Sequence, residues 1–207
     1  MSDEVRYPQF ASRGRAYVYV LPCRDEDLLK LGFSRDPFTR FHTLHRRFHE
    51  FFDLDRGLLI EVDRVATARR IERRFIDTWI ENRAAAPLVV REAAAGYTEW
   101  YRGIYAEVTA SAERLAHEEG HKLHRPLRPW LRALLEERAD WLYSGTASLL
   151  EQVEYERFHG DPRRPMQRAL LDVLGMCESI GLPLERLVPE NVLQWYLYGD
   201  HQARQGL

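Results

Sequence analysis

The sequence predicts an α+β unit over about residues 14–105, followed by an all-helical domain over residues 124–207. Two runs rich in β-branched and aromatic residues, 15–21 and 28–33, are typical of strands. Residues 67–82 repeat apolar side chains at the spacing of an amphipathic helix. Beyond residue 124 the pattern is helical, and glycine or proline marks the joints between segments. These three observations carry the assignment of fold class.

The elements of the first unit follow the order β-β-α-β-α. The polar link 22–27 suits an antiparallel hairpin between the first two strands. A helix over 34–50 is indicated by Asp36 as N-cap and Pro37 at the first helical position. A third strand over 57–65 and the helix over 67–82 complete the order.

The boundaries of the remaining segments come from capping and breaking residues. Residues 1–13 form a polar lead-in, and residues 106–123 are expected to form a connecting helix or linker. Thr98 as cap and Glu99 in the first turn predict a helix that runs to about Glu119. A short extended piece is expected at 88–90, and the helices of the second half are expected near 126–143, 146–158, 163–180 and 184–198.

Composition excludes several classes of protein. The chain has 207 residues, 45% of them hydrophobic and 30% charged, which argues against wholesale disorder. With two cysteines, a cysteine-based zinc site or a disulfide scaffold is not expected. No apolar run has the length of a membrane span, and the acidic N-terminus does not have the order of a secretory signal. The expected location is the cytoplasm.

The net charge of −2 hides an uneven distribution. Residues 1–105 carry 18 basic and 16 acidic side chains, a net charge of +2, and residues 106–207 carry 12 and 16, a net charge of −4. Nearly all the basic residues are arginine, which makes planar contacts with phosphate. A local basic surface for nucleic acid is therefore compatible with the total.

Glu72 interrupts the apolar stripe of its helix. On a helical wheel it lies about 40° from the centre of the stripe, away from the neighbouring arginines. A carboxylate in that place needs compensation. It either pairs with a nearby arginine at the edge of the stripe or binds a divalent cation or moves protons.

The helix over 34–50 carries a row of three histidines, His42, His45 and His49. Their spacing suits metal ligation, but no acidic partner completes a zinc set, so a solvated or partly buried row is the expected arrangement. Arg40, on the same helix, together with a strand tyrosine, a strand lysine and Glu72, makes a set that is chemically complete for phosphodiester cleavage.

Five short motifs in order resemble the GIY-YIG endonuclease superfamily. Tyr17-Val18-Tyr19 is similar to the first motif and Lys30-Leu31-Gly32 to the second, with Arg40 eight residues after the glycine. Glu72 matches the metal-binding glutamate of the family, and the stretch 96–101 resembles the closing threonine-glutamate-tryptophan-aromatic motif of a phage-associated branch. Lys30-Leu31-Gly32-Phe33-Ser34 and Asp36-Pro37 also agree with that branch.

The resemblance covers about residues 14–105 and implies a small three-stranded sheet flanked by helices. It implies DNA cleavage with one divalent metal, Mg²⁺ or Mn²⁺, bound by Glu72. Tyr19 would activate or position the attacking water, Lys30 would stand where many members have tyrosine, and Arg40 would contact the scissile phosphate. These four side chains should therefore converge on one concave surface.

Some positions depart from the family pattern. Tyr17 replaces a glycine, and Leu44 stands where a histidine is common, with His42 and His45 on either side. His45 is taken as the candidate catalytic histidine. The candidate contacts with DNA are Tyr17, Arg35, His42, Arg46, Arg47, Arg69 and Arg73.

The sequence leaves three functions open. The first is a metal-dependent DNA endonuclease, whose helical half supplies target choice, a homodimer contact or a protein partner. The second, suggested by the departures, is a nucleic-acid-binding or interaction module without turnover. The third is a helical partner module that recruits an intact nuclease domain.

Overall fold

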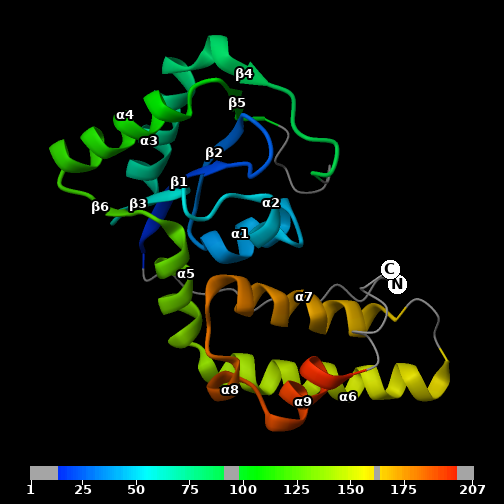
Figure 1. Ribbon diagram of the computed structural model, residues 1–207. Helices are drawn as coiled ribbons and strands as arrows, with labels where there is room; N and C mark the ends of the chain where they lie inside the picture. Colours follow the sequence, from blue (N-terminus) through cyan, green and yellow to red (C-terminus); the bar gives the residue numbers. More distant parts are fainter. Residues whose placement is uncertain (1–13, 91–97, 161–163, 200–207) are drawn as a thin grey trace. The chain divides into compact units, whose positions relative to one another are not determined.

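The computed structural model describes residues 14–90, 98–160 and 164–199, and it is an α+β structure (Figure 1). The chain divides into two compact units, residues 1–130 and 131–207. The division falls within helix α5 (Leu127–Glu136). The first unit therefore extends beyond the end predicted at residue 105.

A six-stranded antiparallel sheet forms the centre of the first unit. Its strands lie in the order β4-β5-β2-β1-β3-β6. They span Ala16–Pro22 (β1), Leu28–Ser34 (β2), Leu58–Val62 (β3), Arg83–Ala84 (β4), Trp100–Arg102 (β5) and Lys122–His124 (β6). The expectation of three strands is therefore wrong, although the three predicted strands are the neighbours β2, β1 and β3. The additional strands are two or three residues long, too short to show an alternating pattern.

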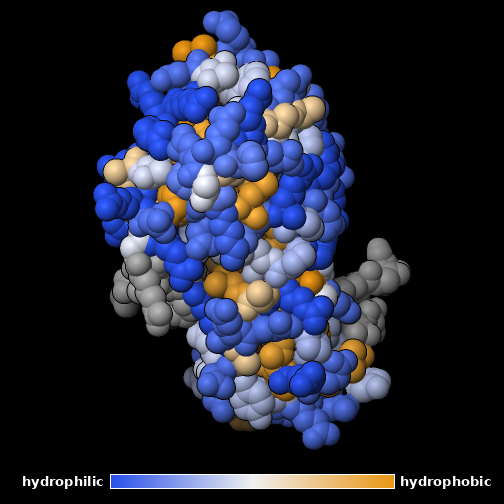
Figure 2. Space-filling view, turned by 90° about the vertical axis from the view of Figure 1, so that its left-hand side faces the viewer, coloured by the Kyte–Doolittle hydropathy of each residue, from blue (hydrophilic) through white to orange (hydrophobic). Residues whose placement is uncertain are grey.

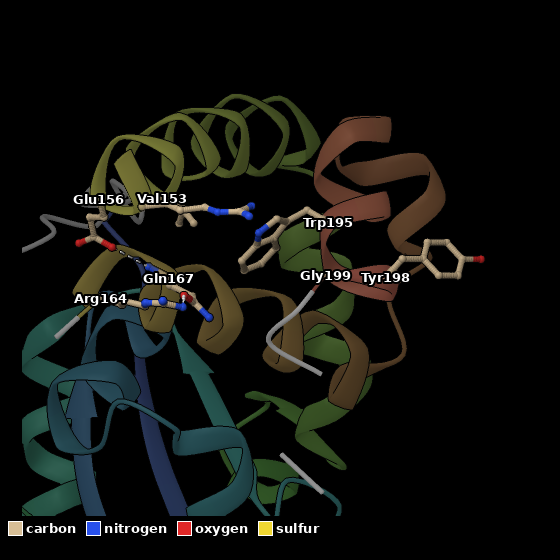
Figure 3. Close-up of a pocket in the computed structure, with 8 residues that line it drawn as sticks. Val153, Glu156, Arg164, Gln167, Trp195, Tyr198 and Gly199 are labelled. Atoms are coloured by element: carbon tan, nitrogen blue, oxygen red, sulfur yellow. Dashed lines mark hydrogen bonds between the residues drawn. The ribbon is translucent and has the colours of Figure 1, made fainter. Parts of the chain in front are cut away.

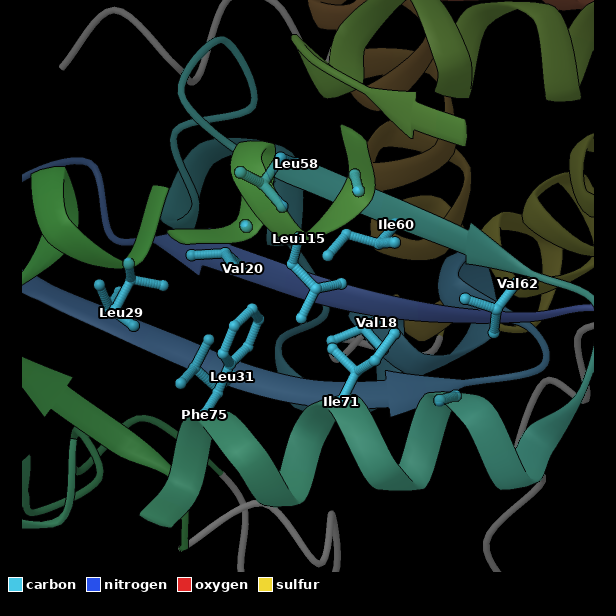
Figure 4. Packing of buried hydrophobic residues seen from close by; sticks show 14 of the residues in the cluster. Val18, Val20, Leu29, Leu31, Leu58, Ile60, Val62, Ile71, Phe75 and Leu115 are labelled. Atoms are coloured by element: carbon cyan, nitrogen blue, oxygen red, sulfur yellow. The ribbon is translucent and has the colours of Figure 1, made fainter. Parts of the chain in front are cut away.

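One face of the sheet packs against helices α3 (Val65–Thr78) and α4 (Tyr105–Glu118). The inward-facing residues of β1 to β3, among them Val18 and Ile60, are fully buried against Ile71 and Phe75 of α3 and Leu115 of α4 (Figure 4). Each such aliphatic side chain contributes about 1.5–3 kcal/mol by leaving water. This core fixes the position of α3, and α3 carries Glu72.

The other face packs against α1 (Pro37–Leu44) and α2 (Phe48–Phe51). Asp36 caps α1, since its carboxylate accepts from the backbone of Thr39 at 3.1 Å. The single helix predicted over 34–50 is interrupted, because His45 has an extended backbone and ends α1. The interruption lets the aromatic side chains of α2 turn toward α1, where the ring centroids of Phe41 and Phe48 are 5.8 Å apart.

The helix predicted to start at Thr98 begins seven residues later. Trp100 to Arg102 pair with β2 as β5, and Gly103 turns the chain with a φ of 75° before α4 begins at Tyr105. Residues 106–123, expected as a connecting helix or linker, contain most of α4, which packs on the sheet, and the first residues of β6, which pairs with β3. The predicted motif residues 96–97 lie outside the described part of the chain.

The remaining boundaries differ less from prediction. Helix α3 ends at Thr78, and a 3-10 turn, η1 (Ile80–Asn82), follows it. The predicted extended piece at 88–90 is a turn.

The described regular elements of the second unit are all helices. They form the end of α5, then α6 (Ala139–His159), α7 (Pro165–Ile180), α8 (Leu184–Leu187) and α9 (Glu190–Tyr198). The joint predicted between 143 and 146 is absent, because α6 continues through Gly145. Among the described helices, none has the length and apolar character required to cross a membrane.

Aromatic side chains of α1 and α2 enclose His42, and this predicts that the folded protein loses stability at acid pH. Burial and the nearby His49 lower the pKa of His42 to about 4, from 6.5, and the His42 ring lies 4.7 Å from both Phe38 and Phe48. The unfolded chain therefore binds a proton between pH 6.5 and 4 that the folded chain does not bind. The free energy of unfolding should fall over this window by up to about 1.4 kcal/mol per pH unit from this histidine.

Urea unfolding at pH 7 and pH 5 measures this fall. His42→Gln should flatten the pH dependence, whereas His117→Gln, at an exposed position on α4, should leave it as in the wild type. An identical pH slope for His42→Gln and the wild type would contradict the assignment.

Candidate active site at the edge of strand β2

The candidate site lies along the edge of β2, next to the residues that pair with β5. Strand β5 covers only Leu28 to Lys30 of that edge. Beyond it the backbone N–H of Leu31 donates to the carbonyl of Glu99 at 3.0 Å, and the N–H of Phe33 donates to the Glu72 carboxylate. Two successive outward N–H groups of a strand are about 7 Å apart, so Glu72 and Glu99 are neighbours along this edge.

Lys30 is buried, with 1% of its surface exposed. Its ammonium donates to the carbonyls of Leu31 at 2.9 Å and Thr98 at 2.7 Å, and to Glu99 Oε2 at 3.1 Å. These three acceptors match the three donors of a lysine ammonium. Burial lowers the pKa of Lys30 to about 8, although the Glu99 carboxylate acts in the opposite direction.

The Tyr19 side chain lies over Gly32, on the face of the sheet that is covered by α1. The two residues are directly paired in the β1–β2 register. A Cβ atom at Gly32 would lie 2.3 Å from Tyr19 Oη, so only glycine leaves room for the phenol. Arg40 Nε donates to Tyr19 Oη at 3.2 Å. Burial raises the pKa of Tyr19, and the adjacent Arg40 guanidinium opposes this only in part, so the phenol is neutral at physiological pH.

Glu72 reaches the same edge from α3 and is half-buried. Burial raises the pKa of its carboxyl, and the negative charge of Glu99 adds to the rise, whereas Lys30, the Phe33 N–H and Arg40 lower it. The alternative of an ion pair with an arginine of its own helix does not account for these contacts. Arg70 and Arg74 face Glu119, Arg73 faces Asp77, and Arg69 lies over the Phe33 ring.

Four of the residues expected to act together are thus brought together. Tyr19, Lys30, Arg40 and Glu72 come from β1, β2, α1 and α3, and the charges of Arg40 and Glu72 act on the pKa of both Tyr19 and Lys30. Sequence reasoning missed the participation of Glu99, which it placed in a helical turn. A buried lysine needs an acidic partner, and that requirement was the available signal.

The three histidines pack against the phenylalanine rings of α1 and α2. The His45 ring stacks on Phe51 at 4.6 Å, and no described contact joins it to Tyr19, Arg40 or Glu72. His42 and His49 are kept neutral at physiological pH by burial, since the pKa of each is about 4. His42 is therefore not a cationic contact for phosphate at neutral pH. In the described ranges no group of three His, Cys, Asp or Glu side chains could hold a metal.

The arginines expected to contact DNA are exposed. Arg69 lies near the site, with its guanidinium 5.7 Å from the Phe33 ring. Arg73 follows one helical turn later and pairs with Asp77 at 3.3 Å, while Arg47 pairs with Glu50 at 2.7 Å. Arg35 and Arg46 are also exposed, and Tyr17 is half-buried with its ring edge-on to Trp130. In Figure 2 the face of the first unit that is turned to the viewer is mostly hydrophilic, with small separate apolar spots.

A second concave feature lies within the helical unit. The lining of this pocket, which has a volume of about 290 Å³, includes an indole, a phenol and two guanidinium groups (Figure 3). The Glu156 carboxylate already accepts from the backbone N–H of Met166 at the start of α7, at 3.0 Å. The described lining is Val153, Glu156, Arg157, Arg164, Gln167, Trp195, Tyr198 and Gly199.

Comparison with known proteins adds no relative. No protein-family model matches the chain, and neither the curated proteins nor the solved structures contain a match.

The contact between Gly32 and Tyr19 predicts the effect of one methyl group. Gly32→Ala forces the buried Tyr19 ring to move and should lower the free energy of unfolding by about 1–3 kcal/mol. The matched control is Gly175→Ala in α7, where an added Cβ meets nothing within 4 Å. That change should stabilise by about 0.5–1 kcal/mol, as expected for a helical glycine. Chemical denaturation measures both, and a neutral Gly32→Ala would contradict the close approach.

Proposed function

We propose that the chain is a divalent-metal-dependent DNA endonuclease that hydrolyses phosphodiester bonds at the edge of β2. The observation that carries the proposal is the convergence of Tyr19, Lys30, Arg40 and Glu72 from four separate elements. A cation, a neutral phenol and a partly buried carboxylate at one edge suit a reaction in which negative charge develops on a phosphate.

The residues present fit a single Mg²⁺ or Mn²⁺ ion. Glu72 is a half-buried carboxylate whose raised pKa reflects burial and the nearby negative charge of Glu99. Magnesium is commonly bound through one or two carboxylates, with water and substrate phosphate completing its shell. Glu72 would hold the ion, and the bound ion would supply Lewis-acid stabilisation of the phosphate charge.

The chain's own groups have separate tasks in this reaction. Arg40 would bind the phosphate and stabilise its growing charge. Because the Tyr19 phenol is neutral, it serves as a hydrogen-bonding group that orients the water or phosphate and supports Arg40, and it is a poor base.

The surroundings suit a nucleic-acid backbone. Arg69 and Arg73 project from the helix that carries Glu72, and Arg35, Arg46 and Arg47 flank α1 in the sequence. Exposed guanidinium groups of this kind neutralise phosphates without reading sequence.

The finer fold assignment is also a proposal. Strands β1 to β3 with α1 and α3 are compatible with a GIY-YIG-type core, to which β4, β5 and β6 add strands at both edges. The second unit exposes Tyr143, Tyr155, Phe158 and Tyr198, side chains suited to a second copy or another protein partner. Two copies would supply the two sites that a double-strand cut requires.

A binding module without turnover is the competing function. It is favoured by the Lys30 ammonium, whose three hydrogen bonds all go to protein oxygens. Such a module would bind DNA through the same arginines but leave the backbone intact.

Plasmid cleavage separates the two functions. The full chain should nick supercoiled DNA with Mg²⁺ or Mn²⁺ and leave it intact with EDTA. Glu72→Ala should reduce the rate by at least about 100-fold because the cation loses its protein ligand. The matched control is Glu118→Ala, at an exposed position on α4, which should cleave at the wild-type rate. DNA binding without cleavage under either metal would contradict the endonuclease and support the binding module.

A further inference from the structure

Lys30 is not accessible to solvent at the edge of β2. Only 1% of its side chain is exposed, and its ammonium donates to Leu31 O, Thr98 O and Glu99 Oε2. The Glu99 side chain, in contrast, keeps 24% of its surface exposed. At this edge the carboxylate is therefore the more accessible member of the pair.

The backbone of Glu99 is held in a conformation that side-chain-bearing residues rarely adopt. Its φ is 62°, in the left-handed region. The Glu99 carbonyl accepts from Leu31 N at 3.0 Å, and the preceding carbonyl accepts from Lys30. Strained residues held by surrounding contacts cluster at functional sites. Here the contacts fix the carboxylate beside the ammonium.

Glu99 is also close to the other groups of the site. Its charge raises the pKa of both Glu72 and Tyr19. The titratable groups on which its charge acts are Lys30 from β2, Tyr19 from β1, Glu72 from α3 and Tyr101 from β5, and the Arg40 guanidinium from α1 acts on the first three of these. Of these, the two phenols are poor bases and Glu72 is assigned to the cation, so among the described groups around the site Glu99 is the carboxylate that remains for proton transfer.

We propose that Glu99 is the proton acceptor of the hydrolysis and that Lys30 is the positioning residue that holds its carboxylate. This inference rests on the proposed endonuclease function. In the step, an O–H bond of the attacking water breaks and its proton passes to a Glu99 carboxylate oxygen. The water oxygen bonds to phosphorus as the bond from phosphorus to the leaving oxygen breaks. The leaving oxygen takes a proton from solvent, and Glu99 returns its proton to solvent.

The test compares single-turnover cleavage of a DNA duplex by the full chain and by Glu99→Gln. The glutamine amide oxygen can still accept from Lys30, but it cannot take up the proton. We expect a rate loss of at least about 100-fold, in the range for general-base catalysis. Affinity for DNA without divalent metal and the Mg²⁺ concentration at half-maximal rate should stay within threefold of wild type. Glu118→Gln is the matched control and should cleave as the wild type does.

Each outcome decides the proposal. A Glu99→Gln rate within threefold of wild type, with Glu72→Ala inactive, would overturn the role of Glu99 and leave the endonuclease standing. A tenfold rise in the Mg²⁺ requirement would identify a metal ligand and also overturn it. A wild-type chain that does not cleave DNA would overturn both. If Glu99→Gln is too unstable to assay, Glu99→Asp decides. Measurable turnover by Glu99→Asp supports a carboxylate base, and complete loss of turnover in a folded Glu99→Asp overturns it.

Discussion

The hydrogen bonding of the buried Lys30 ammonium is the constraint on which the site depends. A charged ammonium inside a protein is costly unless oxygen atoms surround it. Leu31, Thr98 and Glu99 supply those oxygens, and two of the three lie far along the chain from β2. This requirement draws the stretch before β5 to the edge of β2. The short strand β5 and the strained backbone of Glu99 then have the same physical cause, which is the hydrogen bonding of the Lys30 ammonium.

The same edge explains why groups from both faces of the sheet can meet. Tyr19 and Lys30 belong to the face covered by α1, whereas Glu72 belongs to the helix on the opposite face. Among the described residues β5 pairs only with Leu28 to Lys30 of β2, and beyond them Glu72 accepts from the outward N–H of Phe33. Gly32 completes the arrangement, because a side chain there would displace the Tyr19 phenol. A small change in strand pairing would therefore disperse the site.

The sequence predicted the parts of this arrangement that depend on local pattern. The three central strands and α3 follow from runs and periodicity, and the misplaced carboxylate at Glu72 was visible on a helical wheel. The short strands were missed because pairing with distant strands forms them. At Thr98 and Glu99 a good capping pattern gave the wrong prediction, since pairing with β2 outweighs a local preference for helix. The catalytic and DNA-binding roles stay predictions.

In the proposed function, the edge of β2 binds a divalent cation and a phosphodiester. Anomalous diffraction from crystals of the full chain grown with Mn²⁺ and a short DNA duplex tests this most directly. We expect a manganese peak bonded to a Glu72 carboxylate oxygen, with a DNA phosphate between it and Arg40. Manganese bound elsewhere, with DNA lying away from Arg40 and Glu72, would contradict it.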